Sequence, residues 1–465
     1  MSLTGIAFLI CFVVGLGLAL FRHPRYGLYT YLAVFYLDPH SRWWGAMLPP
    51  IRWSLIVGVV MLIATLRMPP RRGVVAWYET TPARLLMVFS IWLWLQNFWA
   101  LSPADHLQAS ILFTKYIVLF AVIYRMMETP ADVKECMFVH VAGCAYLGWL
   151  AYRAPGGGRL EGVGGPGIDE ANALAMFIGT GIVCGAMLIL AERRWKQWIS
   201  ILVMPLLLNT VVQSQSRGAM IAILCGALVL LYLKPRPYRA QFYTFALLGI
   251  VLFGIVSQDV FWTRMKTLTA TVEQGAEIDS SAESRVVLLN AQLRMAADYP
   301  FGSGHRGTAV LSPRYMDAKW LTKTPDDPNV EGARSSHNTF MSALVEQGLP
   351  GAVIFVGLLL WVVRSIFVVK RHRAVAKNPK SDILVFTPAL IAAAIVVFVA
   401  GNFTDYLKTE VQIWMYALLA ASTRVHMPHE LADTGLTSES PGAAPASALR
   451  ARRSRFSAGR KSRST

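Results

Sequence analysis

The stretch "ILVFTPALIAAAIVVFVAG", residues 383–401, contains no charged side chain. A helix needs about 20 consecutive, predominantly apolar residues to cross the hydrocarbon core of a bilayer, so this stretch is predicted to span a membrane. Two more blocks of the same kind are "LTGIAFLICFVVGLGLALF" (residues 3–21) and "GAMIAILCGALVLLYL" (residues 218–233). The sequence therefore predicts a helical membrane protein.

The composition extends this prediction to the whole chain. Of the 465 residues, 55% are hydrophobic and 15% are charged, whereas soluble globular proteins carry about 25% charged residues. We expect an all-α polytopic membrane protein with 12–13 transmembrane helices and one large, partly helical loop outside the cytoplasm. The second of the thirteen candidate segments is short, and one of the set could be re-entrant or interfacial, so 12 spans fit equally well. The candidates lie near residues 3–21, 25–38, 51–66, 84–101, 108–126, 134–152, 171–191, 197–212, 218–233, 240–257, 351–369, 383–400 and 405–422.

The first apolar block and the cysteines have simple interpretations. The first block has no basic residues before it and no clear cleavage site, so we interpret it as a retained helix rather than a signal peptide. The five cysteines all fall in or beside apolar segments, and none forms a CxxC pair. We interpret them as small core residues and expect no disulfide, no metal site and no cofactor.

The net charge of +17 has a topological explanation. Basic residues concentrate in short segments between the spans, as the positive-inside rule requires of cytoplasmic loops. We therefore expect no nucleic-acid partner and a cytoplasmic carboxyl terminus. The tail, residues 423–465, is predicted to be disordered and to contact anionic membrane lipid. The basic segments include "RHPR", "RMPPRR", "AERRWKQ", "KPRPYR" and "KRHRAVAKNPK".

One long interval without a spanning block divides the chain into parts. Residues 1–257 and 351–422 supply the predicted transmembrane helices, and residues 258–350 form the large extracytoplasmic loop. We expect this loop to be folded, because "SSAES" offers a capping box from Ser280 to Glu283 before the periodic run "RVVLLNAQLRMAADYP". The Gly-rich segment at residues 156–167 lacks the strand and helix of a nucleotide-binding loop and is interpreted as a connector or lid.

Two arginines lie at the predicted extracytoplasmic level. Arg217, in "VVQSQSRGAM", sits between two spans that are too close together for a loop. It either reaches toward lipid headgroups or binds an anion within the bundle, and the positive-inside rule weakens the first alternative. Arg285, in the first turn of the predicted loop helix, shares a face with Gln292; a solvated surface arginine is the alternative. The apolar stripe beside them is expected to consist of Val286, Leu289 and Leu293.

A histidine occurs where the chain re-enters the membrane, in "ARSSHNTFMSALVEQGLPG", residues 333–351. Ser335 and Ser336 are predicted to cap a short interfacial helix that ends near residue 347, before "GLPG" breaks the chain ahead of the span. This places His337 and Asn338 at a helix start and keeps Glu346 out of the hydrocarbon. An amphipathic interfacial histidine is the alternative, but a helix start favours the neutral imidazole that a proton acceptor must be.

These residue types suggest one chemistry. The planar guanidinium group binds phosphate oxygens in pairs and stays charged in a low dielectric. Two arginines and a histidine at the outer surface of a bundle therefore predict a diphosphate site with a proton transfer beside it.

Three stretches together resemble the O-antigen ligase and polymerase superfamily: "SQSRGAM" after a span, "ESRVVLLNAQLRMAADYPFGSGHRG" in the large loop and "HNTFMSALVEQGLPG" before the next span. The resemblance covers about residues 160–420. In addition, "YLDPHSRWWGAMLPPIRWSL", residues 36–55, resembles the amino-terminal part of a subgroup of O-glycosylation ligases associated with exosortase systems.

The resemblance implies a metal-independent, inverting, GT-C type glycosyltransferase of the bacterial inner membrane with its active site facing the periplasm. Such an O-antigen ligase transfers polysaccharide from undecaprenyl pyrophosphate to a hydroxyl of the lipid A-core oligosaccharide in lipopolysaccharide biosynthesis. Carried over by motif, Arg217 and Arg285 would hold the pyrophosphate, and His337 would activate the acceptor hydroxyl. Second-tier candidates are His305, Arg306, Asn338 and Glu346.

Three alternatives stay open. An O-antigen polymerase and a protein O-oligosaccharyltransferase would use the same donor, so these residues do not separate them from a ligase. A transporter of an anionic substrate is the alternative from another class. It predicts charges deep in the spans and broken helices, whereas the polar residues here cluster at one surface.

Overall fold

The computed structural model describes residues 2–69, 74–154, 160–165, 167–192, 195–257, 280–321, 332–376, 378, 380–407 and 409–426. Residues Met1–Met427 form one compact unit. The predicted disordered tail lies almost entirely outside the described residues. The predicted cap residue Ser280 is the first residue of α12, and its side chain is outside the described part of the structure.

The described residues contain sixteen α-helices and no β-strand, which confirms the all-α class. The amino-terminal part holds α1 (Leu3–Phe21), α2 (Arg25–Leu37), α3 (Trp53–Leu66), α4 (Thr81–Gln96), α5 (Pro103–Met126), α6 (Pro130–Arg153), α7 (Ala171–Ala191), α8 (Trp195–Ser214), α9 (Arg217–Tyr232) and α10 (Arg239–Val256). The remainder holds α12 (Ser280–Asp298), α13 (Gly307–Tyr315), α14 (Thr339–Glu346), α15 (Gly348–Val375), α16 (Asp382–Ala400) and α17 (Glu410–Ala420).

Every predicted span coincides with one of these helices. Seven described helices are long and apolar enough to cross a membrane on their own, and α3 and α9 are shorter apolar helices. The chain is thus a multi-pass membrane protein, while the count of 12 or 13 crossings stays a prediction. The seven are α1, α5, α7, α8, α15, α16 and a segment that runs from Arg236 to Ile255 through α10.

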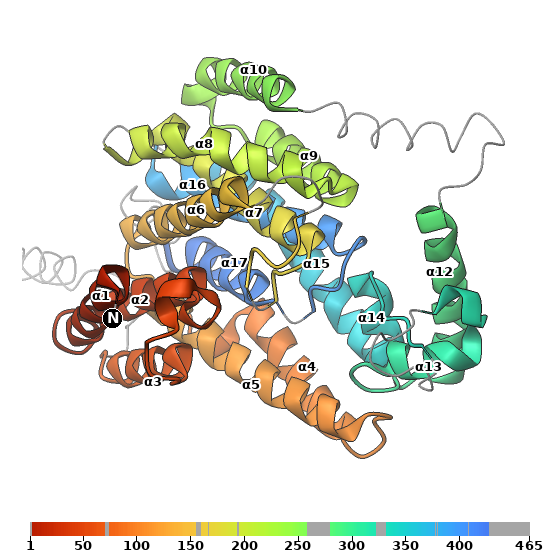
Figure 1. The fold of residues 1–465 in the computed structure, drawn as a ribbon. Coiled ribbons are helices and arrows are strands. Elements are labelled where there is room, and N and C mark those ends of the chain that lie inside the picture. The colour runs from red at the N-terminus through yellow and green to blue at the C-terminus, as the bar shows by residue number, and fades with distance from the viewer. Residues whose placement is uncertain are drawn as a thin grey trace, which may run out of the picture. The chain divides into compact units, whose positions relative to one another are not determined.

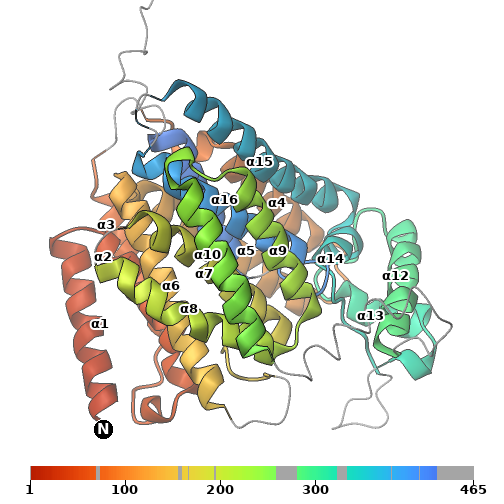
Figure 2. The same ribbon diagram turned by 90° about the horizontal axis from the view of Figure 1, so that it is seen from above.

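Helices α7 and α16 lie inside the bundle, where α7 packs against α6, α8 and α9 (Figures 1 and 2). In the most apolar 18-residue stretch of each helix, 89% of the residues of α7 and 94% of those of α16 are buried. Small residues allow this close packing: a Cβ atom on Gly181 of α7 would lie 2.6 Å from the Sγ atom of Cys144 on α6. Cys136, Cys144 and Cys184 are buried free thiols, as expected of core residues, whereas Cys11 is exposed.

The described part of the large loop is folded at one end of the bundle, where α12 and α13 pack beside α14 (Figure 1). The three residues of the predicted apolar stripe of α12, Val286, Leu289 and Leu293, are all exposed. The buried face is offset around the helix because it must meet both α13 and α14. Its small core consists of Leu288, Ala291, Met295, Leu311, Met316 and Val345.

Backbone hydrogen bonds attach this loop to the bundle. The N–H groups of Ser303 and Gly304 donate to the carbonyls of Val345 and Glu346 at 3.0 and 2.9 Å. From α4, the side-chain amide of Gln96 donates to the carbonyls of Phe301 and Glu346. The turn at residues 301–304 is therefore held between α4 and the end of α14.

The junction of α14 and α15 differs from the prediction in two ways. The N-cap of α14 is Asn338, whose side chain accepts from the N–H groups of Phe340 and Met341, and not Ser335 or Ser336. In addition, "GLPG" does not separate the helices but forms the first turn of α15. The break is confined to Gln347 and Gly348 because Gly348 adopts a φ of +69° that is strained for other residues.

We predict that Gly302→Ala destabilises the protein. Gly302 has a φ of +83°, and a Cβ atom there would lie 2.5 Å from both Gln96 Nε2 and the Glu346 carbonyl oxygen. Left-handed strain and overpacking together should cost about 2 kcal/mol or more. The measurement is the thermal unfolding midpoint of the purified protein in detergent. Gly17→Ala is the control, because its Cβ atom would meet nothing within 4 Å; equal midpoints for the two variants would contradict the prediction.

Candidate functional site

A cavity of about 420 Å³ opens where the loop subdomain meets the ends of the helices. Four separate segments line it: the start of α7 with the residues before it, the turn into α13, the chain around α14, and the connection between α16 and α17. The lining residues are Gly167, Asp169, Glu170, Ala173, His305, Arg306, Ala309, Ser335, Ser336, His337, Glu346, Thr404 and Asp405.

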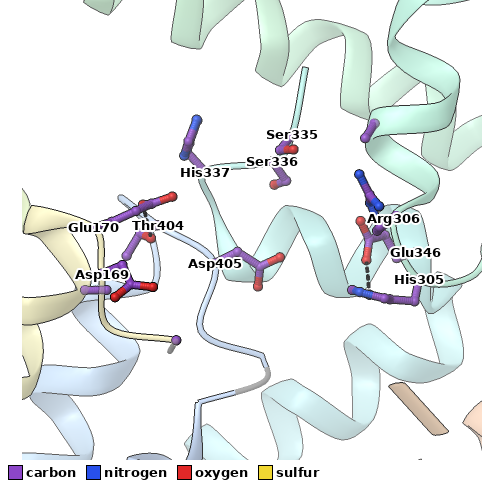
Figure 3. A pocket seen from close by; sticks show the side chains of 13 residues that line it. Asp169, Glu170, His305, Arg306, Ser335, Ser336, His337, Glu346, Thr404 and Asp405 are labelled. Carbon is purple, nitrogen blue, oxygen red and sulfur yellow. Dashed lines mark hydrogen bonds and ion pairs between the residues drawn. The ribbon is translucent and has the colours of Figure 1, made fainter. Parts of the chain in front are cut away.

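Figure 3 shows how the polar side chains are arranged. Asp169, Glu170 and Thr404 lie on one side, and His305, Arg306 and Glu346 lie on the other, with His337 and Asp405 between them (Figure 3). The wall is therefore acidic: four carboxyl groups accompany one arginine and two histidines.

His106 of α5 holds the turn before α13 in place through a hydrogen bond. The backbone N–H of His305 donates to Nδ1 of His106 at 2.9 Å. Because Nδ1 accepts, the proton of His106 resides on Nε2, which donates to the carbonyl of Leu93 at 2.8 Å. His106 thereby sets the position of His305 in the cavity wall, while Gly304 supplies the required φ of +82°.

His305 and Glu346 form a buried pair across the cavity wall. Nδ1 of His305 lies 3.2 Å from Oε2 of Glu346. Burial raises the pKa of Glu346 to about 7, although N–H groups of Arg306 and Thr308 hydrogen-bond the carboxylate and oppose the shift. The carboxyl group of Glu346 can therefore hold or release a proton near neutral pH.

Asp405 is the second buried acid of the cavity. It accepts hydrogen bonds from the Ser342 hydroxyl at 2.9 Å and from the N–H of Leu407 at 3.1 Å. Burial, together with the nearby charge of Glu346, raises the pKa of Asp405 to about 7. The two acids are therefore coupled: ionisation of one disfavours ionisation of the other.

The connection that carries Asp405 is tied to α14 by one threonine. The Thr339 N–H donates to the Gly401 carbonyl at 2.6 Å, and its hydroxyl donates to the Thr404 carbonyl at 2.9 Å. The same hydroxyl accepts from the N–H of Tyr406 at 2.8 Å. Thr404 and Asp405 therefore keep a fixed position relative to the start of α14.

His337 is half-buried and lines the cavity one residue before the Asn338 cap. Its neighbour Ser336 is pinned by three hydrogen bonds: Gln292 of α12 donates to its hydroxyl oxygen at 2.8 Å, the Asn338 N–H donates to the same oxygen, and the hydroxyl donates to the Asn338 carbonyl. The backbone that carries His337 is thus held between α12 and α14.

The two predicted pyrophosphate ligands lie outside the cavity lining. Arg217 is half-buried at the start of α9. The hydroxyl of Ser216 donates to Asn172 at 2.7 Å, and a side chain on Gly218 would overlap the ring of Phe403. Arg217 therefore lies between two segments that contribute to the cavity, residues 169–173 and 404–405.

Arg285 lies on an exposed part of α12. Its neighbour Ser284 accepts a hydrogen bond from Arg334 at 3.3 Å, two turns of the helix from the contact of Gln292 with Ser336. Of the three residues expected around one cavity, the structure brings only His337 to its wall. The catalytic and binding roles of all three remain predictions.

Four of the seven sequence candidates line the cavity, namely His305, Arg306, His337 and Glu346, and Asn338 caps the adjacent helix. Sequence reasoning missed Asp169, Glu170, Thr404 and Asp405. A usable signal existed, because Asp169 and Glu170 immediately precede one predicted span and Asp405 separates two others at the same predicted level. Within the described residues, no group of three His, Cys, Asp or Glu side chains could hold a metal ion.

We predict that Glu346→Gln changes the pH dependence of stability. The pKa of Glu346 lies near 7 in the folded protein and near 4.3 in an unfolded chain. Between about pH 4.5 and 7, Glu346 is therefore protonated in the folded protein but ionised in the unfolded chain. The contribution of Glu346 to the free energy of unfolding declines as pH rises through this range. The measurement is the unfolding midpoint of wild type and variant from pH 5 to 8.

The variant should gain stability relative to wild type across this range, because glutamine does not ionise. Glu283→Gln, at an exposed position of α12, is the control and should show a constant difference from wild type. A pH-independent difference for Glu346→Gln would contradict the assignment of a raised pKa.

Comparison with known families agrees with the resemblance noted in the sequence. Residues 202–356, about a third of the chain, match the family described as O-antigen ligase. No curated protein matches the chain. The matched segment runs from α8 into α15 and carries Arg217, Arg285, His305 and His337. It supports a glycosyltransferase-like enzyme of the O-antigen ligase or polymerase type, and the exosortase-associated subgroup stays a prediction. The chain is a multi-pass membrane protein, and its residues 202–356 are similar to the O-antigen ligase family.

Proposed function

We propose that this protein is an O-antigen ligase. It transfers a polysaccharide from undecaprenyl pyrophosphate to a hydroxyl group of the lipid A-core oligosaccharide, on the periplasmic side of the bacterial inner membrane. One observation carries the proposal: His337 and other residues of the matched domain line a cavity of about 420 Å³ that is completed by walls from outside that domain. Residues 167–173 and 404–405 supply these walls, at the ends of α7 and α16.

His337 is the proposed general base. It precedes the N-cap of α14, where the helix dipole favours a neutral imidazole. In this form it accepts the proton of the acceptor hydroxyl while the hydroxyl oxygen attacks the anomeric carbon of the donor. The bond from that carbon to the pyrophosphate oxygen breaks, and the lipid-linked pyrophosphate leaves with the electron pair. In-line attack inverts the anomeric centre.

The acidic wall supports a role in acceptor binding. Carboxylates accept hydrogen bonds from sugar hydroxyls, and Asp169, Glu170 and Asp405 line the same cavity as His337 and lie on one side of this residue (Figure 3). The same charges would repel a pyrophosphate group. We therefore infer that the acceptor sugar occupies the acidic part of the cavity and that the pyrophosphate lies toward the arginines.

Arg217 and Arg285 are the proposed pyrophosphate ligands. Arg217 lies directly beside the cavity walls, and Arg285 lies on the helix that holds Ser336 through Gln292. Arg306 can assist from the cavity mouth, since its side chain is 59% exposed and its pair with Asp105 at 3.3 Å is a weak surface contact. Guanidinium groups would stabilise the charge of the departing pyrophosphate without a metal ion.

An O-antigen polymerase is the second candidate, because the family match supports either type of enzyme. Transfer to a protein hydroxyl would need the same donor and base. The transporter hypothesis receives less support from the structure. The buried acids Glu346 and Asp405 lie outside the seven span-length helices, at the margin of the bundle, and not at mid-span.

We predict that His337→Ala abolishes glycan transfer. Loss of a general base typically costs about 10²–10⁴-fold in rate. The measurement is transfer by purified protein from lipid-linked polysaccharide to lipid A-core. His23→Ala is the matched control, because His23 pairs with Glu128 outside the cavity lining and this variant should retain activity. Wild-type activity in the His337 variant would remove this residue from the mechanism.

We predict that Arg217→Ala and Arg285→Ala weaken use of the donor more than use of the acceptor. The readout is the KM for each substrate in the same assay, with the Arg314→Ala variant of α13 as a control. Arg314 is exposed and contacts Tyr315. An unchanged donor KM in both arginine variants would refute the pyrophosphate role.

Genetics separates the ligase from the polymerase. Deletion of a ligase gene should leave lipopolysaccharide with bare core while polymerised lipid-linked glycan accumulates. Deletion of a polymerase gene should leave core that carries single repeat units. Electrophoresis of lipopolysaccharide from the deletion strain distinguishes the two patterns, and the second pattern would overturn the ligase proposal.

A further inference from the structure

A second cavity, of about 330 Å³, lies outside the matched domain. Its walls come from the end of α2, the start of α3, the start of α17 and the connector before α7. The stretch at residues 36–55, which the proposed mechanism does not use, supplies most of the lining. The lining residues are Val34, Phe35, Asp38, Pro39, His40, Arg52, Trp53, Ser54, Leu55, Gly164 and Glu410.

Specific contacts build this cavity. Asp38 ends α2 in a left-handed conformation with a φ of +38°. Nε2 of His40 donates to the Ile51 carbonyl at 3.0 Å and closes the loop between α2 and α3. The guanidinium group of Arg42 donates to the carbonyls of Leu37 and Val163, each at 3.3 Å, and thereby docks the connector onto this loop.

Two buried polar atoms of the lining lack a hydrogen-bond partner among the described residues. They are Nε1 of Trp53, whose residue is 3% exposed, and Oδ2 of Asp38. Burial of an unsatisfied donor or acceptor typically costs about 1–3 kcal/mol. Both atoms are almost fully covered, so a ligand in the cavity would satisfy them only after the side chains rotate toward it, and such a ligand would need to both donate and accept hydrogen bonds.

The other lining groups narrow the class of ligand. Asp38 and Glu410 contribute two carboxyl groups against the single guanidinium of Arg52, so a phosphate group would meet repulsion. The carboxyl oxygens can accept from hydroxyls, Arg52 can donate to them, and the side chains of Phe35 and Leu55 offer an apolar surface. A sugar ring presents hydroxyls on its rim and C–H groups on its faces, which matches this combination.

We propose that this second cavity binds one neutral sugar unit of a glycan substrate. The connector links it to the first cavity, because Gly164 lines the second and Gly167, Asp169 and Glu170 line the first. Three residues of extended chain span at most about 11 Å, so the two linings approach each other closely. A glycan whose reacting sugar lies beside His337 reaches the second cavity with a neighbouring sugar. This inference rests on the proposed function for the identity of the substrate.

The binding test uses saturation-transfer NMR on the full-length protein in detergent. The probes are glucose, galactose, mannose and N-acetylglucosamine, with inorganic phosphate in a separate sample. At least one sugar should receive saturation, and its signal should fall at least two-fold in Asp38→Asn and in Trp53→Phe. Asparagine keeps the shape of aspartate and tolerates left-handed backbone, so the first variant preserves the fold.

The matched control is Asp382→Asn, at the start of α16, where the carboxylate pairs with Lys134 outside the lining of both cavities. This variant should retain the full sugar signal. Equal sugar signals in wild type and both cavity variants would overturn the proposal, as would phosphate binding that is lost in Asp38→Asn.

A transfer assay separates this inference from the proposed function. In an active protein, Asp38→Asn should raise the KM for one glycan substrate at least five-fold while kcat stays near the wild-type value. An unchanged KM in an active protein would overturn the sugar subsite and leave the ligase function intact. Absence of transfer by the wild type would instead count against the proposed function, and the NMR result would still decide whether the cavity binds sugar.

Discussion

Hydrogen bonds between the turn at residues 301–304 and the end of α14 hold the candidate site together. The carbonyls of Val345 and Glu346 accept from Ser303 and Gly304 at a point where α14 has no further helical turn to satisfy them. This contact fixes Glu346 against His305 and connects the loop subdomain to α4. Without it, neither α13 nor the segment before α14 would keep its position relative to the bundle.

The cavity wall is acidic because its charged side chains are found at the ends of the helices and not in their apolar interiors. The apolar interiors of α7 and α16 exclude ionised groups because a charge there is costly. The acids therefore gather at the helix ends, where Glu346 and Asp405 are buried but hydrogen-bonded. Their raised pKa values near 7 allow the wall to change charge around neutral pH. An acidic wall suits a polyhydroxylated acceptor, whereas the arginines beside it suit an anionic leaving group.

The first cavity is lined by residues from inside and outside the matched domain, whereas the second lies outside it. Residues 202–356 carry the proposed base and the proposed phosphate ligands, while the segments after α2, before α7 and after α16 carry most of the acidic groups of the two linings. The connector before α7 contributes residues to the linings of both cavities.

The sequence by itself determined the helical class and the positions of the apolar helices, because the cost of unpaired backbone polar groups in a membrane leaves few other solutions. It also identified His337, His305, Arg306 and Glu346, since each occurs beside a break in an apolar pattern. Only the tertiary structure revealed that Asp169, Glu170 and Asp405 join them, and that Val286, Leu289 and Leu293 face outward. Periodicity shows that a helix has a face but not which neighbour covers it. Contacts between segments more than 60 residues apart, such as Ser342 with Asp405, leave no local pattern in the chain.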